Sequence, residues 1–155
     1  MFTKLIASNC NKDKSNDVHP AFIEIIKQLS PLDAKVLSIF RYNSTYPTAE
    51  LEVVDNDGLI TPYRYILFDF KNKKEEFDIN EELNLLTTID NLIRLGIIIK
   101  NKSILELKYD YNNFKNHTFY KIVDKEKDTN SRIQILNSRI ELTNMGRKFL
   151  NICIM

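Results

Sequence analysis

Leu95-Gly96-Ile97-Ile98-Ile99-Lys100 joins the end of a helical pattern to an apolar strand. Glycine is common just after a helix, because it adopts the left-handed conformation without steric cost. Further along, Arg139-Ile140-Glu141-Leu142 reads as a strand, and Thr143 then caps an amphipathic helix that continues through Gly146 to Leu150. A helix, a β-ribbon, and a strand that turns into a final helix together predict a winged-helix layout.

The chain up to Leu95 predicts three helices, and the last of them is the one that ends before Gly96. Pro20 opens the first, in which Phe22, Ile25, Ile26 and Leu29 recur at helical spacing. The second begins at Ser30-Pro31, where Ser30 can cap the helix and Asp33 can complete a capping box. The third covers about residues 80–95 and is expected to be capped by Asn80, with leucines and isoleucines forming its buried stripe.

Most predicted strands lie late in the chain. They cover 97–100, 103–109, 118–123, 132–136 and 139–142, and a strand is also expected within 59–70. Residues 41–48 are expected to be irregular because of Pro47, and 50–54 could be strand or short helix. The fold class predicted is therefore α+β, a winged-helix-like domain over 19–155, and 1–18 are read as the end of a preceding helix and a polar loop.

The composition excludes few functions, but it indicates the compartment in which the protein is expected to work. The formal net charge is only +1, so no strong global attraction to nucleic acid or membrane follows. The two cysteines, Cys10 and Cys153, cannot form a zinc quartet, and we predict a reducing cytoplasm and no structural disulfide. No apolar run approaches the roughly 18 residues needed to cross a bilayer, so no membrane segment is expected.

The predicted outward face of helix 80–95 is poorly suited to binding DNA. In a winged helix this element would enter the major groove, where carboxylates repel phosphates. The predicted outward residues include three carboxylates and one guanidinium: Glu81, Glu82, Asn84, Thr87, Thr88, Asp90, Asn91 and Arg94. We therefore expect a protein partner, or self-association, at this face in preference to DNA.

The predicted wing carries the basic residues. With Arg94, the candidates for nucleic-acid binding are Lys100, Lys102, Lys108, Lys115 and Lys121, and aromatic residues lie between them. Basic and aromatic side chains together can hold single strands by charge and stacking. Solvated lysines diluted by nearby carboxylates are the alternative interpretation, and nucleic-acid binding through the wing is kept as a second hypothesis.

One residue pair has the spacing of a nuclease site. Glu106 and Lys108 share a face of a predicted strand, and some metal-dependent nucleases hold Mg²⁺ and polarise water with a Glu-x-Lys pair. No companion acidic residue can be identified, so a nuclease is a minor alternative. We predict no catalytic residues, no metal and no cofactor.

Four blocks of the chain resemble the Abi-alpha family, also catalogued as DUF4393. They are His19 to Ala34 with its preamble Leu5-Ile6-Ala7-Ser8, Tyr46-Pro47, Asp90 to Gly96, and Leu142 to Phe149. The resemblance covers nearly the whole chain and implies a bacterial abortive-infection protein that resists phage. It also implies a further N-terminal region in family members, so that this chain would be the C-terminal domain. We expect a non-catalytic module that binds a protein partner or that N-terminal region.

Overall fold

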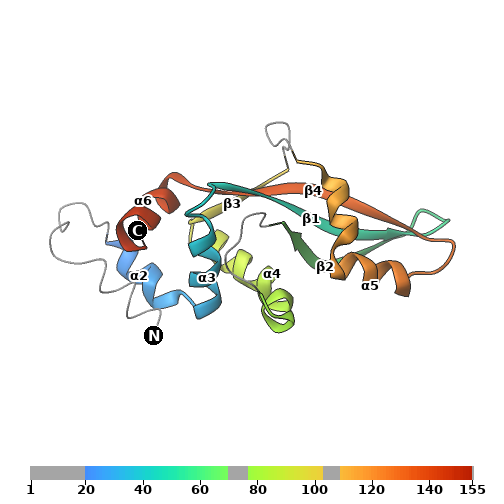
Figure 1. Cartoon of the computed structure of the whole chain (residues 1–155), viewed down its shortest axis with the longest axis horizontal. Coiled ribbons are helices and arrows are strands. Elements are labelled where there is room, and N and C mark those ends of the chain that lie inside the picture. The colour runs from blue at the N-terminus through green and yellow to red at the C-terminus, as the bar shows by residue number, and fades with distance from the viewer. Residues whose placement is uncertain (1–19, 70–76, 103–108, 155) are drawn as a thin grey trace. The chain divides into compact units, whose positions relative to one another are not determined.

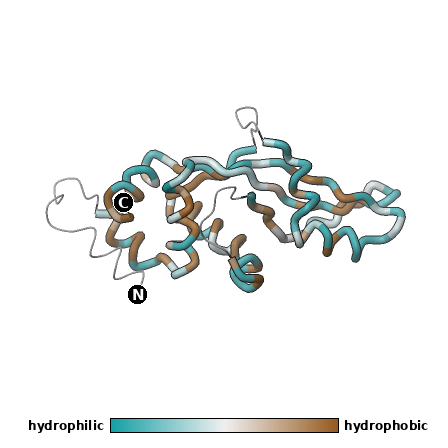
Figure 2. Tube along the Cα trace, viewed as in Figure 1, coloured by the Kyte–Doolittle hydropathy of each residue, from teal (hydrophilic) through white to brown (hydrophobic). Residues whose placement is uncertain are grey.

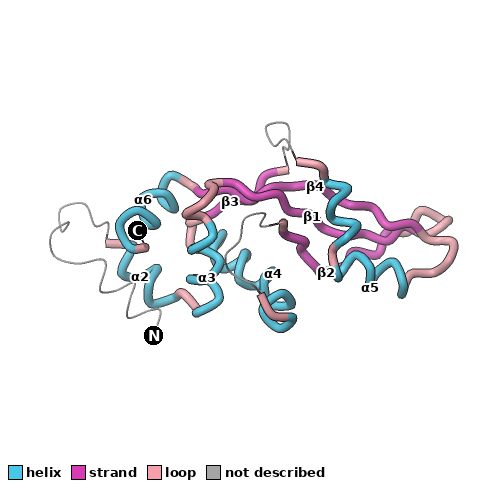
Figure 3. Tube along the Cα trace, in the orientation of Figure 1, coloured by secondary structure: helices cyan, strands magenta, loops and turns pink. Residues whose placement is uncertain are grey.

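The computed structural model describes residues 20–69, 77–102 and 109–154, except for the side chains of Arg64 and Tyr65. Helices and an antiparallel sheet are mixed, which confirms the α+β class (Figures 1 and 3). The contacts divide the chain into two compact units. Unit 1 holds helices from both ends of the chain, and unit 2 holds most of the sheet.

Unit 1 is built from the helices α2 (Ala21–Gln28), α3 (Pro31–Ile39), α4 (Ile79–Arg94) and α6 (Asn144–Cys153). Hydrophilic and hydrophobic residues recur along α2, α4 and α6, as in amphipathic helices (Figure 2), whereas α3 is buried over most of its length. Phe22 of α2 and Phe149 of α6 meet edge to face, with ring centroids 5.4 Å apart. The first and last described helices therefore share one core.

The local helix signals are largely confirmed. Ser30 and Asp33 form both bonds of the predicted capping box at the start of α3. Gly96 follows α4 with φ +71, and Thr143 caps α6 by accepting the N–H of Gly146 at 2.9 Å. The predicted cap of α4 was wrong by two residues, because Asp78 caps that helix in place of Asn80. Asp78 and Glu81 form a second capping box there.

The sheet has four strands in the order β2-β1-β4-β3. They are β1 (Thr45–Val54), β2 (Ile60–Phe68), β3 (Ile98–Asn101) and β4 (Arg132–Leu142). β1 and β2 pair antiparallel from Thr48↔Phe68 to Val54↔Ile60 around the predicted turn at Gly58, with a register shift after Glu50. The two strands predicted at 132–136 and 139–142 are one continuous strand.

The core of unit 2 covers one part of this sheet with two helices. The 3-10 helix η2 (Tyr111–Asn116) and α5 (Thr118–Glu126) contact each other and pack on β1 and β2. Their buried side chains form one cluster with those of the strands: Ala49, Leu51, Val53, Leu67, Tyr111, Phe114, Phe119 and Val123. Tyr111 also donates its hydroxyl to the carbonyl of Ser138 on β4, at 2.7 Å.

Two predictions of local structure were wrong in unit 2. Residues 118–123 form a helix, because the i, i+4 pair Phe119 and Val123 is buried against η2, and a strand would have placed Lys121 on the same face. Pro47 lies inside β1, although 41–48 was expected to be irregular. It precedes the stretch paired with β2, and its carbonyl accepts the N–H of Asp69. The absence of a backbone N–H at Pro47 therefore costs little stability at this position.

Cys153 is fully buried in α6 and is disulfide-bonded. The prediction of no structural disulfide is therefore wrong. The chain's other cysteine, Cys10, lies outside the described residues, as do the predicted segment 1–18 and residues 103–108 of the predicted strand 103–109. Two isolated cysteines carry no spacing signal, so only the tertiary fold reveals that Cys153 is paired.

Candidate functional site

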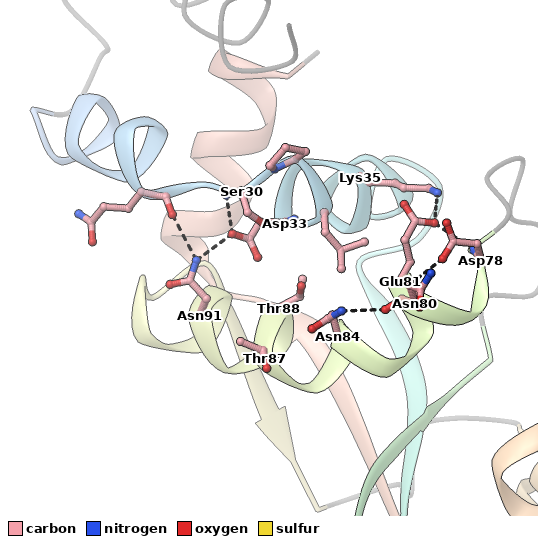
Figure 4. A pocket seen from close by; sticks show the side chains of 13 residues that line it. Ser30, Asp33, Lys35, Asp78, Asn80, Glu81, Asn84, Thr87, Thr88 and Asn91 are labelled. Carbon is pink, nitrogen blue, oxygen red and sulfur yellow. Dashed lines mark hydrogen bonds and ion pairs between the residues drawn. The ribbon is translucent and has the colours of Figure 1, made fainter.

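An open groove lies between α3 and α4 in unit 1, with a volume of about 970 Å³ (Figure 4). That is within the range of small-molecule and peptide pockets, roughly 300–1,000 Å³. The N-terminal turn of α3 forms one wall. One face of α4 forms the other, where residues recur three and four apart: Asn80, Glu81, Asn84, Thr87, Thr88 and Asn91.

Asp33 joins the two walls at one end of the groove. Its carboxylate is only 2% exposed and accepts the backbone N–H of Ser30 at 2.7 Å. The same Oδ2 accepts the side-chain amide of Asn91, from α4, at 2.8 Å. Asn91 also reaches the carbonyl of Gln28, at 3.4 Å. A buried carboxylate held by charge-assisted hydrogen bonds fixes the separation of the two helices at this point.

An ion pair joins the two walls at the other end of the groove. Lys35 of α3 donates to Oε2 of Glu81 at 2.6 Å, and its ammonium lies 4.8 Å from the ring centroid of Phe77. Glu81 also accepts the backbone N–H of Asp78, so one carboxylate serves the cap and the ion pair. The space between these ties is lined by amides and hydroxyls, as the sticks in Figure 4 show.

The groove is acidic. Asp33, Asp78 and Glu81 line it against one cation, Lys35. Its amides and carboxylates suit a ligand with N–H donors or positive charge. Among the residues that the structure describes, no cluster of three or more histidine, cysteine, aspartate or glutamate side chains could hold a metal. The carboxylate most deeply placed, Asp33, already accepts two short hydrogen bonds.

Half of the residues predicted to face outward on the third helix are exposed. Asn84, Thr87, Asp90 and Arg94 of α4 reach solvent, but Thr88 is only 4% exposed and belongs to the buried side. Arg94 donates to Oδ1 of Asn91 at 2.8 Å and to Oε1 of Gln28 at 3.0 Å. Its guanidinium therefore extends the hydrogen-bonded tie that begins at Asp33.

The lysines predicted to bind nucleic acid belong to unit 2. Lys100 of β3 pairs with Glu50 of β1, and Lys102 is exposed beside it. Burial, and then the charge of Lys102, lower the pKa of Lys100 from its usual value. Lys115 of η2 and Lys121 of α5 are exposed. Lys108 lies outside the described residues, and so does the Glu106–Lys108 pair.

A small hollow of about 200 Å³ collects part of this set. Glu50, Lys100, Lys102 and Asn137 are among its lining residues. Oδ1 of Asn137 is buried and has no hydrogen-bond partner within the described part of the chain. The structure thus brings Lys100 and Lys102 together with an unsatisfied acceptor.

Sequence reasoning missed the groove. Neither Lys35 nor Asp78 was predicted to be a functional residue, and Asp33 was predicted only to cap a helix. The partner of Asp33 across the groove lies 58 positions away, so no local pattern points to it. The signal that was available is the acidic, amide-rich face of residues 80–91.

Comparison with known proteins gives one family and one related fold. A family model described as abortive infection alpha matches residues 1–153. A solved structure of an uncharacterized protein from the marine bacterium Alcanivorax borkumensis SK2 matches with a TM-score of 0.52 and 12% identity. The match covers 94% of this chain and 99% of that one, and at this identity it shows a shared fold alone. No curated protein was found to be similar to this chain. Among the described residues, no helix is long and apolar enough to span a membrane.

Proposed function

Because the chain belongs to the abortive infection alpha family, we propose that it is a non-catalytic interaction domain of a bacterial phage-defence protein. It binds a protein partner, or the N-terminal region of its own protein, through α4 and the adjoining groove. The winged-helix relationship is part of this proposal. It is supported by the order of α4, Gly96 and β3, and by the Thr143-capped helix α6.

The observation that carries the proposal is an apolar stripe on the outer face of α4. Ile79 and Leu83 are 54% and 49% exposed, and Leu86 continues the stripe at the next turn. Residues at i, i+4 and i+7 share a helix face, and this face lies beside the one that carries the buried residues Leu85 and Ile89. Exposed apolar side chains grouped on one element are typical of protein interfaces.

Charge favours protein over DNA at this surface. Glu82 and Asp90 flank the stripe, and the groove beside it is acidic. A phosphate backbone would be repelled, whereas a partner with basic residues around an apolar patch would be attracted. We expect such a partner to place its apolar side chains on Ile79 and Leu83.

The test is the double substitution Ile79→Ser with Leu83→Ser in the full protein. The matched control is Leu59→Ser with Ile60→Ser on the β1–β2 turn, where the same kinds of side chain are 69% and 52% exposed. Surface substitutions of this kind usually change stability by less than about 0.5 kcal/mol each. In a plaque assay the α4 variant should lose phage protection, and chemical crosslinking in cells should lose its partner band. If that variant protects as well as the parent protein, the proposal fails.

Nucleic-acid binding through unit 2 is a second candidate. Lys100 and Lys102 line one hollow, an arrangement able to contact a phosphate. Binding to mixed DNA and RNA should then appear at about 50 mM salt and fall steeply as salt rises. Lys102→Gln should weaken it and Lys127→Gln, whose lysine pairs with Asp124, should not. Absence of binding at low salt removes this candidate.

A further inference from the structure

A second pocket in unit 1 is positively charged. It has a volume of about 310 Å³, the low end of the range for small-molecule sites. Among the described residues, two arginines line it and no carboxylate does, in contrast to the α3–α4 groove. The lining residues come from the turn after α3 and from α6, and include Phe40, Arg41, Tyr42, Arg147, Leu150 and Asn151.

The base of this pocket is fixed by the fold. Phe40, Leu142 and Leu150 are at most 6% exposed. The N–H of Leu142 donates to the carbonyl of Ser44 at 2.9 Å, which holds the turn after α3 against the start of α6. The N–H groups of residues 40, 41 and 42 occupy the last carbonyls of α3, so that helix end has its acceptors satisfied.

The two guanidinium groups differ in how they are held. Arg41 donates one Nη2 hydrogen bond to the carbonyl of Ile154, which anchors its side chain, and its other N–H groups make no hydrogen bond to a described residue. Arg147 makes no side-chain hydrogen bond or ion pair with any described residue, and it is exposed at the pocket rim. Arginine binds both carboxylate and phosphate through paired N–H groups in a planar fork. A phosphoryl group, with three acceptor oxygens and up to two negative charges, can engage both guanidinium groups at once.

We propose that this pocket binds the phosphoryl group of a small phosphorylated molecule, no larger than a mononucleotide. Arg41 and Arg147 contact the phosphate oxygens, and the side-chain amide of Asn151 adds a further donor. Tyr42, half exposed at the mouth, provides an aromatic face for a ring attached to the phosphate. The proposal is independent of the α4 surface described above.

The experiment is calorimetric titration of the full chain at low ionic strength. Inorganic phosphate, adenosine monophosphate and adenosine are titrated separately. Saturable binding of phosphate and of the nucleotide, with none of adenosine, is the expected result. Tighter binding of the nucleotide than of phosphate would assign a role to Tyr42, and equal binding would identify the phosphate alone as the ligand. No saturable binding of either phosphate compound at millimolar concentration overturns the proposal.

Variants separate the pocket from general surface charge. Arg147→Gln should weaken binding by about tenfold or more, because a charge-assisted bidentate contact is lost. Lys148→Gln removes the same charge from the next residue of α6, which does not line this pocket, and should leave binding unchanged. Arg147→Lys should fall between them, since it keeps charge without the fork. If the two glutamine variants weaken binding equally, the effect is unspecific and the proposal is wrong. Binding should persist in the Ile79→Ser, Leu83→Ser protein, so failure of one proposal is separate from failure of the other.

Discussion

Replacing Gly146 by alanine tests how closely α6 approaches the segment after α4. By helix propensity alone the substitution should stabilise the protein by about 1 kcal/mol, because alanine is favoured over glycine inside a helix. The structure predicts, in contrast, that the substitution destabilises the protein. A Cβ at Gly146 would lie 2.0 Å from the carbonyl oxygen of Ile97 and 2.9 Å from its carbon.

Ile97 cannot move away without cost. Its carbonyl accepts the N–H of Thr143 at 3.0 Å, and the Thr143 hydroxyl reaches the neighbouring carbonyl of Gly96 at 2.6 Å. Overpacking of this kind costs roughly 1–3 kcal/mol, and loss of the Thr143 cap adds about 1 kcal/mol. After the gain of about 1 kcal/mol in helix propensity, we expect Gly146→Ala to lower the free energy of unfolding by about 1–3 kcal/mol.

Urea unfolding followed by far-ultraviolet circular dichroism measures this change. Asn144→Ala, an exposed substitution in the same helix, should stay within about 0.5 kcal/mol of the parent protein. Gly58→Ala has no atom within 4 Å of the new Cβ but keeps φ +78, so it should cost about 1–2 kcal/mol from backbone conformation alone. A Gly146→Ala protein as stable as the parent would refute the close approach.

Two further predictions concern buried polar groups. Asp33→Ala removes the carboxylate that accepts hydrogen bonds from Ser30 and Asn91, and it should lower the free energy of unfolding in urea by about 2–3 kcal/mol. The control Asp78→Ala, which removes an exposed helix cap, should lower it by about 1 kcal/mol. Equal losses in the two variants would contradict the role given to Asn91. Burial, and then the hydrogen bond to Asp69, raise the pKa of Tyr109 above its usual 10.0. The unfolded chain releases this proton first, so the stability contribution is complete below about pH 10 and is lost as pH rises further. Tyr109→Phe should therefore flatten the fall in stability measured by urea unfolding between about pH 9 and 11, and an unchanged slope would count against the shift.

Short-range signals predicted the helices of unit 1 well. Ser30 and Asp33, Gly96, and Thr143 act within one helical turn of themselves, and each was recognised from its neighbours. A cap needs only the first few N–H groups of its own helix, so its sequence pattern survives whatever surrounds it.

The errors arose where burial overrides propensity. Thr118 to Val123 is rich in β-branched and aromatic residues, yet Phe119 and Val123 are buried together only in a helix. Pro47 is tolerated in β1 because that position precedes the pairing with β2. In each case the deciding contact comes from another part of the chain, which propensity does not include.

The sequence by itself determined the family, the α+β class, the acidic residues of α4 and most helix ends, because these depend on composition, order and local spacing. Only the tertiary structure placed Asn91 on Asp33, 58 positions apart, and so created a groove between α3 and α4. It also paired Lys100 with Glu50 and brought Arg41 and Arg147 to one pocket. Sites of this kind depend on side chains that only long-range packing brings together, and the hydrophobic core that drives this packing specifies no polar pairs in advance.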